Sequence, residues 1–249
     1  MVVPLPASRR ARLLEILERD GAIRLESAAA ELAVSVMTVR RDIQDLDADG
    51  LVRRVRGGAV SIVLPRVFGD RAMTRASAKN SVARKAEALV PSVGAVGVDA
   101  STTSGALLAI IRCERLLVVT NSVDNAAIAR ARPGVRAVLA GGEFEQQTGS
   151  LVGPTAEQTA RSFAYDVFFT SASAVDAATG TMEVSLEEAA VKHAFAARAR
   201  TTVVLADSSK LGQQALALAL EWNVIDTLVT ELDPSDDRLD PFRGLVEIL

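Results

Sequence analysis

The stretch that decides the fold is VSVMTVRRDIQDLDADGLVRRVRGGAV, residues 34–60, which holds five of the ten arginines in residues 1–60. Ser35 can cap a helix that runs to about Asp49, with Gly50 as its stop. The residues after it bracket arginines with apolar side chains and end at Gly57 and Gly58, a strand-and-turn signal. With two shorter helices expected upstream, residues 1–60 are predicted to form three helices and a terminal ribbon.

The helix after Ser35 is predicted to have two chemically different sides. At 100° per residue, its core side is formed by Val36, Val39, Ile43 and Leu46. The opposite side carries Met37, Arg41 and Gln44, with Thr38 and Arg40 on the flanks. Arginine can bond guanine bidentately, glutamine can bond adenine, and an apolar group can meet the thymine methyl. Because a short helix precedes this one, the pattern is typical of a helix-turn-helix that enters a major groove.

An ordinary solvated helix face is the alternative. Arg41 and Asp45 are spaced i, i+4, which suits a surface pair worth about 0.3 kcal/mol. Charge does not decide between the two, since residues 1–60 hold ten arginines and nine acidic residues. The whole chain has a net charge of −3. DNA binding must therefore depend on the placement of the arginines and not on their number.

The remainder of the chain predicts a different architecture. Residues 61–76 lack a clean period and contain Pro65 and Gly69, so they are interpreted as a linker. Residues 77–249 alternate helices with continuous apolar strands, such as RLLVVT at 115–120 and TTVVLA at 201–206. This alternation indicates an α/β domain with a mostly parallel sheet that is covered on both faces.

Polar residues gather at the expected carboxyl ends of these strands, where open α/β sheets place ligands. The first loop, DASTTSGAL, has Asp99 followed by Ser101, Thr102 and Thr103 at a helix start, which could hold a phosphate or only cap the helix. The others are TNS at 120–122, AGG at 140–142 and ADSSK at 206–210. Lysine is scarce, with only Lys79, Lys85, Lys192 and Lys210 in the chain.

Residues 13–59 resemble the DNA-binding domain of the DeoR family of bacterial transcriptional regulators. The resemblance is carried by Ser35, Thr38, Val39, Arg40, Arg41, Asp42, Gly50, Leu51, Arg54, Gly57, Gly58 and Ala59. Arg56 stands where the family often has histidine. A winged helix-turn-helix in residues 1–60 is implied, with a ribbon whose arginines hold phosphates or probe a minor groove. The expected DNA-binding residues are Ser35, Met37, Thr38, Arg40, Arg41, Gln44, Arg53, Arg54 and Arg56.

Residues 77–249 are similar to the DeoR-type sensor domain. That domain resembles ribose-5-phosphate isomerase and the coenzyme A transferases in fold, and it generally binds a phosphorylated sugar or related metabolite. The matching effector-binding positions, with Ser101 added from the first loop, are Asp99, Ser101, Thr102, Thr103, Thr120, Asn121, Gly141, Gly142, Glu188, Lys192 and Lys210. Ser101, Ala174 and Glu145 depart from the family pattern, so a pocket that has lost its ligand is an open alternative.

Together these features predict a cytoplasmic repressor of a sugar-catabolism operon that binds a double-stranded DNA operator as a homodimer or homotetramer. A sugar phosphate is expected to relieve repression. We expect no membrane segment, because no apolar run reaches the ~20 residues of a span. No metal, cofactor or catalytic residue is expected, since the chain has one cysteine, Cys113, and one histidine, His193. The competing class is an isomerase-like enzyme that would use Glu188, Asp207 and Lys210.

Overall fold

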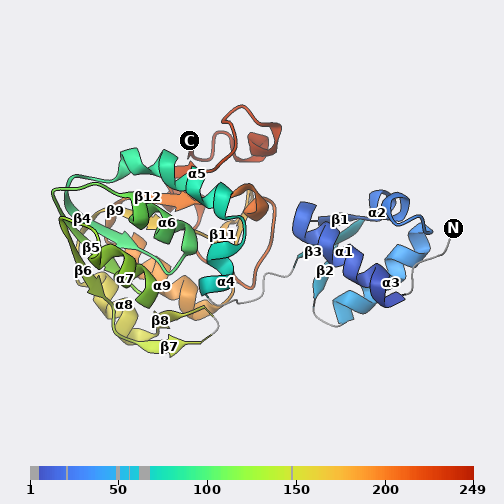
Figure 1. Ribbon diagram of the computed structural model, residues 1–249, viewed down its shortest axis with the longest axis horizontal. Helices are drawn as coiled ribbons and strands as arrows, with labels where there is room; N and C mark the ends of the chain where they lie inside the picture. The colour runs from blue at the N-terminus through green and yellow to red at the C-terminus, as the bar shows by residue number, and fades with distance from the viewer. Residues whose placement is uncertain (1–5, 21, 49–50, 56, 62–67, 147) are drawn as a thin grey trace. The chain divides into compact units, whose positions relative to one another are not determined.

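The computed structural model describes residues 6–20, 22–48, 51–55, 57–61, 68–146 and 148–249. The chain divides into two compact units, Met1–Val63 and Leu64–Leu249 (Figure 1). Within the described ranges, no helix combines the length and apolar character that crossing a lipid bilayer requires.

The N-terminal unit contains three helices and a small antiparallel sheet, as the sequence predicts. The helices are α1 (Pro6–Asp20), α2 (Leu25–Glu31) and α3 (Val36–Ala48), and the strands are β1 (Ala22–Arg24), β2 (Val52–Val55) and β3 (Gly58–Ser61). The sheet order is β1-β3-β2, so the predicted ribbon gains β1 as a third strand. A helix-turn-helix followed by a β2–β3 ribbon is the arrangement of a winged DNA-binding domain.

The core of this unit is formed by one side of each helix. Leu13, Val39 and Ile43 are fully or almost fully buried, and Val52 and Ala59 bring the ribbon onto them. The apolar periodicity of the helices therefore determines which side of α3 faces outward.

The C-terminal unit is built on a seven-stranded sheet whose order is β15-β14-β12-β9-β4-β5-β6. Its strands are β4 (Val93–Val98), β5 (Arg115–Thr120), β6 (Val135–Leu139), β9 (Tyr165–Thr170), β12 (Ala199–Leu205), β14 (Thr227–Val229) and β15 (Glu247–Ile248). All of the neighbouring strands pair in parallel, which confirms the predicted sheet type. From β4 the chain continues outward to β5 and β6, and β9 then starts on the other side of β4.

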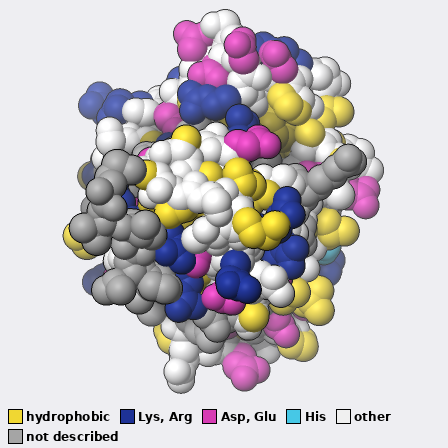
Figure 2. Space-filling model, turned by 90° about the vertical axis from the view of Figure 1, so that its right-hand side faces the viewer, with side chains coloured by type: hydrophobic (Ala, Val, Ile, Leu, Met, Phe, Trp, Pro, Cys, Tyr) yellow, Lys and Arg dark blue, Asp and Glu magenta, His cyan; other side chains and the backbone are white. Residues whose placement is uncertain are grey.

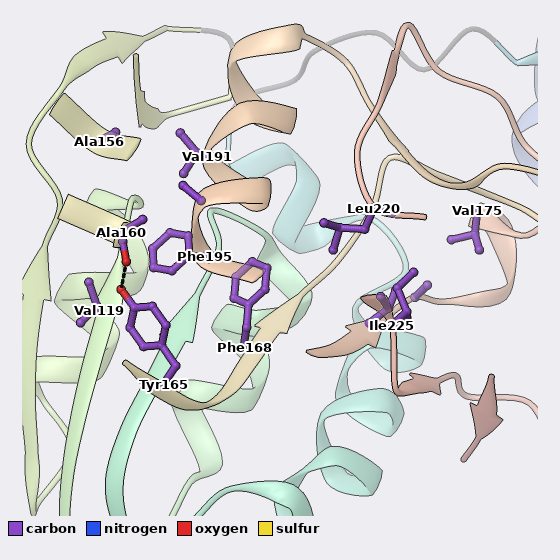
Figure 3. Packing of buried hydrophobic residues seen from close by; sticks show 14 of the residues in the cluster. Val119, Ala156, Ala160, Tyr165, Phe168, Val175, Val191, Phe195, Leu220 and Ile225 are labelled. Atoms are coloured by element: carbon purple, nitrogen blue, oxygen red, sulfur yellow. Dashed lines mark hydrogen bonds between the residues drawn. The ribbon is translucent and has the colours of Figure 1, made fainter. Parts of the chain in front are cut away.

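Helices cover both faces of this sheet (Figure 1). One core contains residues of α8 (Pro154–Arg161) and α9 (Leu186–Ala196), and the other contains residues of α5 (Ala76–Ala86), α6 (Thr102–Ile110) and α7 (Val123–Arg130). In the first core, Phe168 stacks on Phe195 at a centroid distance of 5.1 Å, while the Tyr165 hydroxyl donates to the Ala160 carbonyl (Figure 3).

The remaining elements lie between these helices and strands. They are α4 (Phe68–Met73), β7 (Glu143–Glu145), β8 (Ser150–Val152), β10 (Ala174–Asp176), β11 (Gly180–Glu183), β13 (Ala217–Leu218) and four short 3-10 helices, η1 (Glu87–Leu89), η2 (Ser208–Lys210), η3 (Trp222–Val224) and η4 (Asp237–Phe242). The helix α4 forms within residues 61–76, where the sequence indicates only a linker.

Candidate functional site

The outward side of α3 carries the predicted base-reading residues. Met37 is 67% exposed, and Arg40, Arg41 and Gln44 are exposed as well. Val39, Ile43 and Leu46 are buried beneath them. Val36 departs from the prediction, because it is 37% exposed instead of lying in the core. It is the first residue of α3, and its side chain lies at the rim of the unit.

The start of α3 is fixed by a side-chain cap. Ser35 Oγ accepts the backbone N–H of Thr38 at 3.1 Å, as predicted for an N-cap. The Ser35 and Thr38 hydroxyls also lie 2.8 Å apart, in a hydrogen bond. Both residues expected to contact DNA thus also hold the helix terminus in place.

Acidic residues on α3 are engaged by the N-terminal unit itself. Asp42 is buried and receives a bidentate pair from Arg9 of α1, with Nε–Oδ2 at 2.5 Å and Nη2–Oδ1 at 2.8 Å. Asp47 Oδ1 accepts the Arg54 N–H at 3.1 Å, and Asp45 lies 3.7 Å from Arg10. These contacts reduce the repulsion that the carboxylates would otherwise exert on a phosphate backbone.

The surface view shows the basic groups in their surroundings. Figure 2 looks onto the side of the molecule where α2 and α3 are drawn in Figure 1, and its Lys and Arg side chains are interspersed with acidic and hydrophobic ones. The surface is therefore not uniformly basic. Residues 1–60 are likewise nearly balanced, with ten arginines and nine acidic residues, so the position of each arginine is important.

The ribbon is described only in part. Arg54 is exposed on β2, whereas Arg56 and the side chain of Arg53 lie outside the described residues. Packing within the sheet requires glycine at position 58, because a Cβ there would lie 1.8 Å from the Ile23 carbonyl oxygen of β1. Glycine at position 58 thus allows β3 to lie close to β1, its neighbour in the sheet.

In the C-terminal unit, Asp99 and Lys192 form a buried ion pair at the end of β4. Lys192 Nζ lies 2.5 Å from Asp99 Oδ2 and 2.9 Å from Glu183 Oε1. Asp99 also accepts the backbone N–H groups of Ser101 and Ser171. Burial alone would raise the pKa of Asp99, but the Lys192 ammonium holds it below its usual range.

The two predicted residues of α9 have separate partners. Glu188 Oε1 accepts the Ser150 hydroxyl, which is hydrogen-bonded to Thr148 at 2.8 Å. Thr148 donates its N–H to Glu145 at 2.6 Å, so Glu145 faces this polar chain. Burial, and next the negative charge of Glu183, raise the pKa of Glu188.

The other predicted effector residues lie at the same edge of the sheet and are mostly buried. Ser101 caps α6 by accepting the Ser104 N–H at 3.0 Å, and Thr102 and Thr103 follow it in the first turn. Thr120 accepts the Ser122 N–H, and Asn121 donates to the Leu151 carbonyl while its buried Oδ1 has no hydrogen-bond partner.

The glycine pair after β6 has packing roles. Gly142 has φ +140°, and a Cβ there would lie 2.6 Å from the Val152 carbonyl oxygen of β8. A Cβ on Gly141 would lie 3.1 Å from the Thr155 side chain. These glycines let the β7–β8 hairpin and α8 approach the end of β6 closely.

Three cationic residues of this edge were missed because they come from the expected linker and the helix after it. Arg71 donates to the Ala100 carbonyl at 3.2 Å and to the Thr148 carbonyl at 2.7 Å. Arg75 pairs with Asp207 at 2.9 Å and with Glu231 at 2.9 Å. Lys79 is buried and donates to the Arg71 carbonyl. The scarcity of lysine was a usable signal, since three of the four lysines lie here.

We call the group of Arg71, Arg75, Lys79 and Lys210, with Asp207 and Glu231, the cationic cluster. Arg75 links the two carboxylates, since it forms an ion pair with each. The other charges of the cluster lie close enough to Lys79 to shift its pKa; they are Asp207, Lys210, Arg71 and Arg75. Four cations against two carboxylates leave an excess of two positive charges. Burial lowers the pKa of Lys79 to about 8, and Asp207 only partly opposes this effect. Perturbed titration beside a sheet edge is typical of a ligand site.

Two sequence profiles cover most of the chain. The profile of the DeoR-like helix-turn-helix domain matches residues 9–63, and that of the DeoR C terminal sensor domain matches residues 74–232.

Individual proteins show the same similarity. The chain is 30% identical to the HTH-type transcriptional repressor GlcR of Bacillus subtilis, over 97% of this chain and 95% of that protein. It is 26% identical to the glycerol-3-phosphate regulon repressor of Escherichia coli, over 89% of each chain. Ribose 5 phosphate isomerase A of Neisseria gonorrhoeae overlaps with a TM-score of 0.35 and 17% identity, over 56% of this chain and 53% of the isomerase.

Proposed function

We propose that this chain, which belongs to the DeoR family of DNA-binding transcriptional regulators, represses a sugar-catabolism operon and is released from DNA by a phosphorylated metabolite. Membership in the family gives the two parts, a helix-turn-helix and a sensor domain. It does not support the isomerase-like enzyme considered from the sequence. The GlcR protein and the glycerol-3-phosphate regulon repressor are similar over nearly their whole length, which supports repression as the mode of control.

For the DNA contacts, α3 is proposed to lie in the major groove with Met37, Arg41 and Gln44 toward the bases. Arg40, Arg54 and the hydroxyls at the start of α3 would hold phosphates and fix the register. The exposure of Met37, Arg40, Arg41 and Gln44 above a buried apolar stripe supports this assignment. Arg53 and Arg56 remain proposed phosphate contacts on sequence grounds alone.

The cationic cluster is the observation that carries the effector assignment. It brings four cations to the carboxyl edge of a parallel sheet, where Arg71 bonds to Ala100 after β4 and Arg75 pairs with carboxylates after β12 and β14. An excess of positive charge next to buried hydroxyls favours a ligand that carries a phosphate and further hydroxyl groups. Among the predicted residues, Lys210 and Asn121 are proposed to contact it directly. Lys210 is a partly exposed cation of the cluster, and Asn121 Oδ1 has no hydrogen-bond partner among the described residues.

Asp99, Glu188 and Lys192 are proposed to shape the site from beneath. Their charged atoms are occupied by one another, by Glu183 or by neighbouring hydroxyls. Because these charged atoms already have partners within the protein, a second candidate function is also supported, that of a DeoR-type regulator whose pocket has lost its ligand. The two candidates differ in one measurable property, the response of the DNA complex to a sugar phosphate.

A mobility-shift assay on the DNA beside the chain's own gene tests both parts. We expect a retarded band at low salt, and we expect glycerol 3-phosphate or a pentose or hexose phosphate to remove it. A Lys210→Met variant should keep the band and lose the response. If no duplex is retarded, the regulator proposal is wrong; if a band forms and no phosphorylated metabolite changes it, the ligand-free candidate replaces the first.

The remaining features of the proposal follow from the mode of binding. A two-fold assembly would place two copies of α3 about one helical turn of DNA apart, or a multiple of it. We therefore propose a homodimer or homotetramer that acts in the cytoplasm. Residues 1–60 are proposed as the DNA-binding domain and residues 77–249 as the sensor domain.

A further inference from the structure

A single residue interrupts what would otherwise be one helix between Phe68 and Ala86. The last turn of α4 closes with the Thr74 N–H bonded to the Asp70 carbonyl, and the first turn of α5 with the Lys79 N–H bonded to the Arg75 carbonyl. Both are helical bonds. Between them, Arg75 adopts φ 52° and ψ 36°, the left-handed conformation.

This conformation is unusual for the residue that has it. Left-handed backbone is favoured by glycine and tolerated by asparagine, whereas arginine is a good helix former. Residues 70–79 also contain no proline or glycine that would break a helix. The Thr74 hydroxyl, which donates to the Asp70 carbonyl at 2.9 Å, is a local contact that favours a bend. Two further contacts come from side chains at the bend that reach beyond this turn.

The first such contact is the Arg75 side chain. It pairs with Asp207 and Glu231 at 2.9 Å each and donates to the Ser208 hydroxyl at 2.9 Å. These partners follow β12 and β14, so the ends of two sheet strands hold Arg75 in place.

The second contact is the Lys79 ammonium. It donates to the Arg71 carbonyl oxygen, which in a continuous helix would instead accept the Arg75 N–H. Lys79 therefore satisfies a carbonyl that has lost its helical donor, which stabilises the bent state. Both contacts that hold the bend are made by cations of the cationic cluster.

We propose that Arg75 is the hinge of an effector-operated switch, in which an anionic ligand draws Arg75 and Lys79 to itself and lets α4 and α5 join into one helix. The proposal rests on the proposed function, because it assigns the regulation of the same site. The boundary between the two units falls at Val63 and Leu64, and α4 is the first helix after it, so the proposed switch lies at the part of the C-terminal unit that is nearest in sequence to the DNA-binding domain.

Two substitutions of the same residue separate backbone strain from lost charge. Arg75→Ala and Arg75→Gly both remove the guanidinium, but only glycine accepts the left-handed conformation without strain. We expect Arg75→Ala to increase the ratio of straight to bent molecules roughly tenfold relative to Arg75→Gly. Glu231→Gln leaves the hinge residue intact and should shift the ratio in the same direction as Arg75→Ala, by less.

The helix shape can be read in the full-length chain by electron–electron double resonance between spin labels at positions 69 and 84. Gly69 has open space around it and Arg84 is exposed, so both positions tolerate a cysteine, and Cys113 is first replaced by alanine. A continuous helix separates these Cα atoms by about 22 Å, at 1.5 Å per residue, and a bent one by less. Arg112→Ala, at an exposed arginine beyond the end of α6, is the control.

The expected result is a ratio of straight to bent molecules that is roughly tenfold higher in Arg75→Ala than in Arg75→Gly, with no straight population in the control. Identical distributions for the alanine and glycine variants would overturn the hinge. If circular dichroism shows that Arg75→Ala does not fold, Glu231→Gln is measured in its place. A distance distribution in Glu231→Gln that is identical to that of the wild type would then overturn the hinge. No DNA or effector is present, so failure here is distinct from failure of the proposed function.

Coupling to DNA is tested with the same variants on a duplex that the unlabelled protein retards. Arg75→Ala should bind that duplex several-fold more weakly than Arg75→Gly. Equal affinities, together with a distance shift, would disprove the coupling and leave the hinge standing.

Discussion

The two units of this chain present their motif residues in opposite ways. On α3, Arg40, Arg41 and Gln44 lie exposed above an apolar stripe. At the end of β4, Asp99 and Lys192 are almost completely buried and satisfied by the protein. The motif residues of the first unit are thus accessible to a partner, whereas those of the second have their charges satisfied within the protein.

The largest expected effect breaks this second arrangement. Lys192→Ala would leave Asp99 and Glu183 buried without their cation, at a cost of about 3–5 kcal/mol in the free energy of unfolding. Urea unfolding followed by Trp222, the only tryptophan, reports on the C-terminal unit. Arg41→Ala, whose unfolding is followed by circular dichroism because Trp222 lies in the other unit, is the matched control and should change stability by less than about 0.5 kcal/mol. Equal losses in the free energy of unfolding for the two variants would contradict the difference between the buried pair of the C-terminal unit and the exposed residues of α3.

A smaller effect is expected in the β2–β3 ribbon, where the packing role of Gly58 can be separated from the conformational role of Gly57. Gly58→Ala places a Cβ against the Ile23 carbonyl and should destabilise the N-terminal unit by about 2–3 kcal/mol. Gly57→Ala meets open space and should cost only about 1 kcal/mol, for its positive φ. Hydrogen exchange of the β1 amides measures both. A greater loss for Gly57→Ala would contradict the internal role of Gly58.

The smallest effect is a pH dependence that sharpens the description of the cationic cluster. The pKa of Lys79 falls from 10.5 to about 8 on folding, so between these values the unfolded chain binds more protons. Stability of the C-terminal unit should therefore rise with pH across this window and be lowest, from this group, below about pH 8.

The check is a comparison of urea midpoints at about pH 7.5 and about pH 9.5, using Trp222 fluorescence. Lys79→Met should remove the part of the rise that Lys79 contributes, and Lys85→Met should retain it. An identical slope in the wild type and Lys79→Met would show that Lys79 titrates normally.

Much of the architecture could be predicted from local sequence patterns. The apolar stripe of α3, its Ser35 cap and the continuous strands around 115–120 and 201–206 depend on side chains near one another in sequence. The same reasoning placed Val36 in the core, where the rim of the unit leaves it exposed.

The cationic cluster could not be predicted in this way. Arg71 and Arg75 lie in a stretch without clear periodicity, and their partners are 29 to 156 residues away in sequence. Arg75 likewise has a left-handed conformation that its helix propensity does not predict, and its side chain pairs with the distant Asp207 and Glu231. Motif residues such as Asp99 and Lys192 were located at the correct edge, but the fold determines that their charges are used on each other.

The central claim is that the exposed side of α3 reads base sequence, and one measurement tests it most directly. Fluorescence anisotropy should compare wild type and Arg41→Ala on a duplex that the protein has selected from random sequence and on a scrambled duplex. We predict a loss of about 1–3 kcal/mol in binding free energy on the selected duplex and little change on the scrambled one. Equal losses on both would show that Arg41 contacts only the phosphate backbone and would contradict the claim.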